Sequence, residues 1–157
     1  MKVFSFLVND EFYAVDVALV QRVVQKMTVT PVPSAPDEVI GIANLKGRVI
    51  TVLNLCVLLG DKKKHDIEYG SRAVKAIIFK TFSGSEEQFG LLIDKPGSLV
   101  EINDNTIRPL SRTGETDEGF CISGIAEINN VLLRIINIDS IISKFKLNGG
   151  IENEKYI

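Results

Sequence analysis

The chain has 157 residues, a length typical of one compact domain that can bury its own core. Hydrophobic residues make up 45% of it and charged residues 24%, which excludes disordered, collagenous and coiled-coil classes. Its 18 basic and 20 acidic side chains give a net charge of −2, so the chain as a whole does not attract nucleic acid or anionic lipid.

Short apolar runs rich in Val, Ile, Leu and Phe follow one another along the chain, separated by Gly, Pro, Asn and Asp. Sustained helical periodicity is scarce, so the pattern favours a mainly β fold. We expect strands at Lys2–Val8, Phe12–Val17, Gly41–Leu45, Val49–Leu53, Ala73–Phe82, Phe89–Ile93, Leu99–Ile102, Cys121–Ile128 and Val131–Ile136.

The segment between the second and third of these strands is rich in proline. Thr30–Pro36 holds three of the five prolines, which forbid a central place in a sheet and predict an extended linker. After Pro36, the residues Asp37, Glu38 and Val39 are typical of a single helical turn with acids at its positive end.

Two polar stretches are predicted to be exposed loops. Asp61–Ser71 contains Lys62, Lys63, Lys64 and the single histidine, His65, and the second stretch is Ser111–Glu118. We expect His65 to be solvated because this loop supplies no catalytic or metal-binding partners, and the lysine run is at most a secondary contact.

An internal repeat is the most informative feature of the sequence. Gly41–Leu59 aligns without a gap on Gly124–Ile142, an offset of 124 − 41 = 83 residues. The identical pairs are Gly41/Gly124, Ile42/Ile125, Ala43/Ala126 and Asn54/Asn137, and the apolar pairs are Leu45/Ile128, Val49/Leu132, Ile50/Leu133, Val52/Ile135, Leu53/Ile136, Leu55/Ile138, Leu58/Ile141 and Leu59/Ile142.

Each copy predicts a strand, a tight turn, a second strand and a short helix that an asparagine caps. Upstream, Glu11–Val17 resembles Gln88–Asp94 in the same relative order. Each unit of about 70 to 80 residues is too small to bury a sufficient core by itself, so two packed β-barrels that share a core are expected. Closed barrels also remove sheet edges.

No catalytic, cofactor or metal site is predicted. Cys56 and Cys121 lack a CxxC spacing and a histidine cluster, which indicates two buried small side chains. Asp16 and Asp94 are interpreted as structural turn residues that recur through the duplication. The sequence contains neither a GxSxG nucleophile motif nor a GxxxxGK[ST] phosphate cradle.

The chain is also predicted to stay in the cytoplasm. Its first residues reach Asn9, Asp10 and Glu11 before a signal-peptide core could form. In addition, no apolar stretch approaches about 18 residues, the length a membrane span needs.

Several motifs in order resemble the CheW adaptor family over nearly the whole chain. They are Phe4–Leu7, Phe12–Val17, Val20–Val23, Val32–Pro33, Gly41–Gly47 and Gly90–Asp94, with an ending at Ile138–Ile142. The resemblance implies a single CheW-like domain over residues 1–150, built from two intertwined five-stranded SH3-like barrels with short helices, and a polar tail over 151–157. It also implies a non-catalytic scaffold that couples the histidine kinase CheA, through its regulatory domain, to the tips of methyl-accepting chemoreceptors at membrane arrays.

The same resemblance implies a receptor-binding groove. The matching residues are Arg22, Val23, Ile42, Asn44, Leu45, Lys46 and Gly47. The family usually has glutamate at the position of Arg22 and arginine at the position of Lys46, so an acid and a base become two positive side chains here. Thr51, Asn54 and Cys56 replace the family's proline, aspartate and frequent arginine. We expect the groove between the barrels to bind a receptor tip complementary to this more basic surface, which requires Arg22 and Lys46 to be near neighbours.

Two alternatives remain open from the sequence. A CheW-like adaptor could serve a kinase pathway other than chemotaxis, because the same fold is reused. An SH3-like or OB-like nucleic-acid module would need stacking aromatics and a basic stripe, whereas aromatic residues make up 7% of the chain and its net charge is negative.

Overall fold

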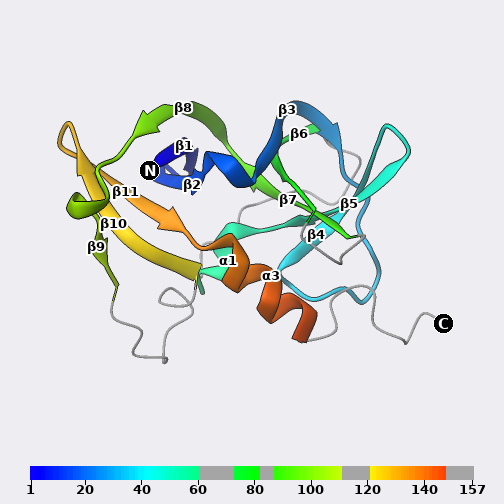
Figure 1. The fold of residues 1–157 in the computed structure, drawn as a ribbon. Coiled ribbons are helices and arrows are strands. Elements are labelled where there is room, and N and C mark those ends of the chain that lie inside the picture. Colours follow the sequence, from blue (N-terminus) through cyan, green and yellow to red (C-terminus); the bar gives the residue numbers. More distant parts are fainter. Residues whose placement is uncertain (61–72, 82–86, 111–120, 148–157) are drawn as a thin grey trace.

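The computed structural model describes residues 1–60, 73–81, 87–110 and 121–147, with the side chains described as far as residue 143. The predicted loops at 61–71 and 111–118, including His65 and Lys62–Lys64, and the predicted tail at 151–157 lie outside the described residues. Figure 1 shows a mainly β molecule in which two curled sheets lie side by side, with short helices between them along the lower side.

The first sheet combines the beginning and the end of the chain. Its strands are β1 (Lys2–Val8), β2 (Glu11–Asp16), β8 (Lys95–Glu101), β9 (Arg108–Pro109), β10 (Ile122–Ile128) and β11 (Val131–Ile136), in the order β8-β1-β2-β11-β10-β9. The second sheet consists of β3 (Val20–Thr28), β4 (Val39–Leu45), β5 (Arg48–Leu53), β6 (Ala73–Phe79) and β7 (Gln88–Ile93), in the order β3-β6-β7-β5-β4.

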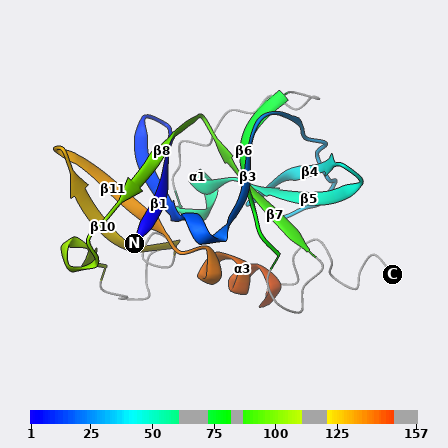
Figure 2. The same ribbon diagram turned by 45° about the horizontal axis from the view of Figure 1, so that its top comes forward.

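The two sheets have the same strand order under the repeat. The offset of 83 relates β4, β5 and α1 (Leu55–Leu58) to β10, β11 and α3 (Ile138–Leu147). In each sheet the second strand of this hairpin pairs in parallel with a central strand, β7 or β2. Because β3 follows β2 of the first sheet and β8 follows β7 of the second, the barrels exchange strands (Figure 2). The predicted intertwined two-barrel fold is therefore confirmed. The first sheet has six strands rather than the expected five, because the two-residue strand β9 is added at its edge.

Each barrel closes through a short antiparallel contact. In the second barrel, Thr30 bridges to Ile42, beyond the end of β3. In the first, Arg108 of β9 pairs with Ile125, which is Ile42 shifted by 83 residues. The Thr30 contact also gives the proline-rich linker a defined starting point.

The structure differs from the sequence expectation at strand β3, at the turn 37–39 and in the upstream repeat. The nine-residue strand β3 was missed, because bulges between Val20 and Arg22 and between Val24 and Met27 disrupt its alternation. The helical turn expected at 37–39 is instead a hydrogen-bonded turn, with the Val39 amide donating to the Pro36 carbonyl over 2.9 Å, and Val39 already begins β4.

The third difference is the upstream repeat. Ala14 pairs with Ile135, and Gly90 pairs with Val52, the counterpart of Ile135. The structural offset is therefore 90 − 14 = 76, whereas the alignment of Glu11 with Gln88 implies 77. A shift of one residue turns every side chain of a strand to the other face.

Tight turns and caps follow the sequence closely. Asn9-Asp10, Lys46-Gly47 and Asn129-Asn130 all have positive φ, as two-residue hairpin loops of the favoured twist require. The Asn54 side chain accepts from the Cys56 amide at the start of α1, and that of Asn137 accepts from the Ser140 amide in α3. Both predicted caps are therefore confirmed.

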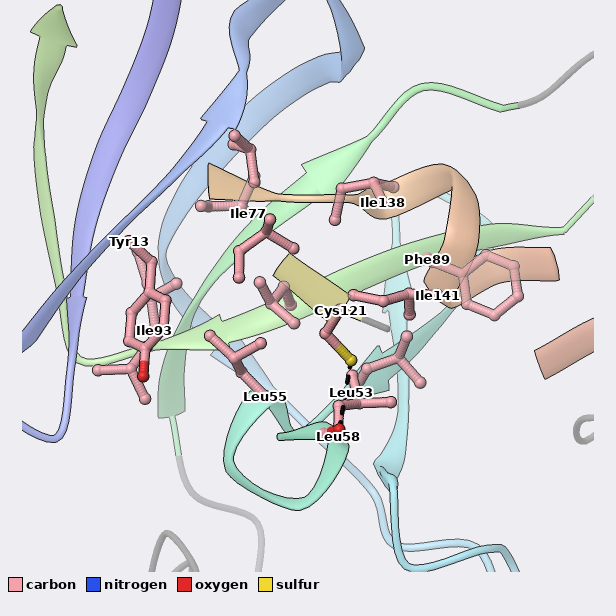
Figure 3. Packing of buried hydrophobic residues seen from close by; sticks show 14 of the residues in the cluster. Tyr13, Leu53, Leu55, Leu58, Ile77, Phe89, Ile93, Cys121, Ile138 and Ile141 are labelled. Carbon is pink, nitrogen blue, oxygen red and sulfur yellow. Dashed lines mark hydrogen bonds between the residues drawn. The ribbon is translucent and has the colours of Figure 1, made fainter. Parts of the chain in front are cut away.

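The core has three parts, one inside each barrel and a larger one between them. Central strands contribute to two parts at once: in β6, Ile77 faces the central cluster and Ile78 faces the interior of the second barrel. Figure 3 shows the central cluster, to which Leu55 and Leu58 of the α1 turn and Ile138 and Ile141 of α3 all contribute. Because the central cluster takes residues from both halves, we expect neither half to fold alone.

Cys56 and Cys121 are both buried in the central cluster, as predicted. The Cys121 thiol donates to the Leu58 carbonyl over 3.2 Å (Figure 3), which ties the start of the C-terminal hairpin to α1.

Candidate functional site

The residues expected to form a receptor groove fall on two elements of the second barrel. Arg22 and Val23 lie near the start of β3, and the remainder lie on β4 and on the turn between β4 and β5. In Figure 1 this β4–β5 hairpin projects at the right, away from the first barrel.

The turn of the hairpin is held by its own side chain. Lys46 and Gly47 have φ of 52° and 82°, and Asn44 Oδ1 accepts from the Gly47 amide over 3.0 Å. Lys46 is exposed at the tip. A lysine in the left-handed region costs conformational energy that glycine and asparagine largely avoid.

The hairpin has an outer and an inner face that divide the expected residues. Ile42 pairs with Thr51 and Asn44 pairs with Val49, and Val49 is 56% exposed. Leu45, by contrast, packs against the cluster inside the barrel. Leu45 therefore supports the hairpin from within, whereas Ile42 and Asn44 belong to its outer side.

Arg22 and Val23 take different environments on neighbouring positions of β3. Val20 pairs with Phe79 and Arg22 with Ile78, so Gln21 is the extra residue of a bulge. Arg22 is exposed, whereas Val23 is half-buried against the central cluster between the barrels. The strand thus presents a cation beside an apolar contact to the shared core.

A series of side-chain hydrogen bonds, the Gln21–Gln88–Arg48 chain, joins β3 to the β4–β5 hairpin. The buried amide of Gln88 in β7 donates to Gln21 Oε1 and to the Phe79 carbonyl, and its oxygen accepts from Arg48 Nη1 over 3.4 Å. Gln21 directly precedes Arg22, and Arg48 directly follows Gly47. Sequence reasoning missed Gln88 and Arg48, although a glutamine that opens the apolar run of β7 was a usable signal.

The surface around these hydrogen-bonded side chains is basic. Arg22, Lys46 and Arg48 are exposed, and within the part of the chain that the structure describes none of them forms an ion pair. Exposed cations of this kind fit a partner that supplies carboxylates.

Glu11, Tyr13 and Arg134 form a cluster of ionisable side chains in the first barrel that connects two strands. Tyr13 donates to Glu11 Oε2 over 3.0 Å, and Arg134 Nη1 lies 3.6 Å from the same oxygen. Burial, followed by the hydrogen bond and the charge of Glu11, raises the pKa of Tyr13 above its ordinary value. These groups join β2 to β11 across the parallel pairing.

Asp16 and Asp94 both act on backbone amides, although not at equivalent places. Asp16 Oδ1 accepts from the Ala18 amide and caps the short helix η1 (Val17–Leu19). Asp94 Oδ2 accepts from the Asn9 amide over 2.7 Å, in the turn between β1 and β2. The structural interpretation of the two aspartates is confirmed, whereas their recurrence through the duplication is not.

Over the described ranges, no three His, Cys, Asp or Glu side chains gather as a metal site would require. The described helices are also all too short or too polar to cross a bilayer.

Comparison with known proteins identifies the family. The model of the CheW-like domain matches residues 2–146. The chain belongs to the CheW-like family. It is 30% identical over 151 residues to chemotaxis protein CheW of Thermotoga maritima, covering 96% of this chain and 93% of that protein. It is 25% identical to CheW of Helicobacter pylori, covering 89% of this chain and 80% of the relative.

A solved CheW structure supports the same assignment. The crystal structure of the scaffolding protein TtCheW from Thermoanaerobacter tengcongensis superposes with a TM-score of 0.70 at 27% identity, covering 87% of this chain and 88% of that one. Family membership and this fold support a chemotaxis coupling scaffold. Within the CheW-like fold, Arg22 and Lys46 both stand on exposed surface.

Proposed function

We propose that this chain is a non-catalytic cytoplasmic scaffold that couples the regulatory domain of the histidine kinase CheA to the cytoplasmic tips of methyl-accepting chemoreceptors. The observation that carries the proposal is the CheW-like fold over residues 2–146, with barrels that share one central core. Two barrels that share one core offer separate surfaces to two partners, as a linker between them requires.

Receptor binding is assigned to Arg22, Val23, Ile42, Asn44, Lys46 and Gly47, with Leu45 as internal support. Two features favour this surface. Its cations are exposed, and the Gln21–Gln88–Arg48 chain holds β3 and the hairpin in a fixed relation. A receptor segment that carries carboxylates is the complementary partner.

Reconstitution tests the coupling role. The chain is mixed with a histidine kinase and a receptor cytoplasmic fragment from the same genome, and complexes are separated by size-exclusion chromatography. A complex of all three supports the proposal. A complex with the kinase alone supports the adaptor of a non-chemotactic kinase pathway, and binding to neither component contradicts both.

Charge reversal tests the receptor surface. Arg22→Glu and Lys46→Glu are expected to weaken receptor binding while the melting temperature changes little, because both side chains are exposed. Lys95→Glu is a matched control, since Lys95 is exposed on β8 of the other barrel. Receptor binding that responds equally to all three changes would refute the assigned surface.

A further inference from the structure

The side chain of Gln88 joins three strands at one end of the second barrel. Gln88 is 2% exposed, and its amide group bonds to Gln21 of β3, to the carbonyl of Phe79 in β6 and to Arg48 of β5. Its amide nitrogen donates twice and its oxygen accepts once. A buried amide satisfied in this way fixes the positions of its partners, because each lost bond would leave a buried polar atom unpaired.

Each of these three partners has an exposed cation close by in sequence. Arg22 follows Gln21, Lys80 follows Phe79, and Lys46 lies two residues before Arg48, which is itself a cation. Lys80 is also anchored through its backbone, since its amide donates to the Leu19 carbonyl over 2.9 Å. The end of the barrel around Gln88 therefore carries positive side chains from β3, from the end of β6 and from the hairpin.

Arg48 differs from the other cations because its guanidinium donates a hydrogen bond to a buried side chain, Gln88. An arginine has five N–H donors, and among the described residues only the contact of Nη1 with Gln88 Oε1 engages this one. Arg48 is exposed, and its other donors form no hydrogen bond with the described residues. A planar fork that is held on one side and open on the other matches a carboxylate better than a lysine does.

We propose that Arg48 binds a carboxylate of the receptor segment and that Gln88 is the positioning residue that holds Arg48 in register with Arg22 and Lys46. The inference rests on the proposed function and names the partner chemistry of that surface. Orientation in advance lowers the entropy that binding must overcome, so a buried residue that never touches the receptor influences its affinity.

Binding of an unmodified receptor cytoplasmic fragment to the full chain tests the assignment, with isothermal titration calorimetry as the readout. Arg48→Gln is expected to weaken binding about tenfold or more, as loss of a charge-assisted pair does. It should also flatten the decline of affinity with added salt. Arg48→Lys keeps the charge but loses the planar fork, so its receptor affinity is expected to lie between that of the natural chain and that of Arg48→Gln.

A double-mutant cycle separates positioning from general stability. Gln88→Met removes both polar atoms of the side-chain amide and keeps an unbranched side chain of similar length. Acting through Arg48, it should weaken binding several-fold in the natural chain and scarcely at all beside Arg48→Gln. A merely structural role predicts the same loss in both backgrounds, and that result would overturn the positioning assignment.

The outcomes distinguish this inference from the proposed function. If the unchanged chain binds the receptor fragment and Arg48→Gln binds it equally well, the carboxylate site is refuted and the scaffold role stands. If the unchanged chain does not bind the fragment, the receptor role fails and the inference fails with it. Thermal unfolding of each variant checks that the exposed substitutions leave the fold intact.

Discussion

Gly41 passes so close to Thr30 that a Cβ on the glycine would stand 2.2 Å from the Thr30 carbonyl oxygen. This approach closes the second barrel, because Thr30 and Ile42 exchange both of their backbone hydrogen bonds, at 2.8 and 2.9 Å. Gly124 has the same role in the first barrel, where a Cβ would lie 3.0 Å from the Arg108 carbonyl oxygen. Barrel closure therefore requires both identical glycines of the repeat.

Replacing Gly41 with alanine is expected to lower the free energy of unfolding by about 3 kcal/mol, the upper end of overpacking costs, because the new methyl group meets backbone atoms that cannot rotate away. Gly124→Ala should cost less, since its tightest neighbour, 2.7 Å away, is the side-chain Cγ2 of Ile107. Urea denaturation measures both. Equal stability of Gly41→Ala and the natural chain would contradict the closure contact.

The alternation of Val49 and Ile50 gives a second test. Val49 is 56% exposed and Ile50 is 1% exposed. Ile50→Ala should therefore cost about 2–5 kcal/mol, whereas Val49→Ala should cost under about 1 kcal/mol. Leu133→Ala and Leu132→Ala form the equivalent pair in the other barrel, at 4% and 48% exposure. Similar losses at both members of a pair would mean that the register is wrong.

Tyr13 predicts how stability changes at alkaline pH. Its pKa lies above the ordinary value of about 10, so the folded chain holds the phenol proton more tightly than the unfolded chain. The resulting stabilisation is fully present below about pH 10 and declines as the pH rises toward the folded pKa. The stability difference between the natural chain and Tyr13→Phe should shrink above pH 10 in urea titrations, and a difference that grows there would contradict this environment.

The left-handed conformation of Lys46 predicts a conflict between stability and binding. Asn129 occupies the equivalent turn position with a similar φ of 51°. Lys46→Asn should raise the free energy of unfolding by up to about 1 kcal/mol, because asparagine tolerates this conformation better. It should also weaken receptor binding through loss of the cation. Calorimetry and urea denaturation of one sample check both effects. A variant that gains stability without losing affinity would show that Lys46 does not belong to the receptor-binding surface.

Sequence patterns predicted most strands because each depends on neighbours only a few residues away. The repeat located β4, β5, β10 and β11 and both asparagine caps, since turn and cap chemistry is local. Strand β3 escaped detection because its bulges break the two-residue period that identifies a strand. The repeat also did not show that Val49 and Leu132 are exposed, because an apolar residue beside a turn carries no local mark of exposure.

The sequence by itself determined the duplication, the mainly β class and the family, because these are written in residue order and spacing. Only the tertiary structure decided that Gln88 brings Gln21 and Arg48 together, across separations of 67 and 40 residues. Such contacts follow from barrel closure and strand register. A one-residue difference between offsets of 76 and 77 turns a side chain from one face to the other, and short-range patterns do not resolve it.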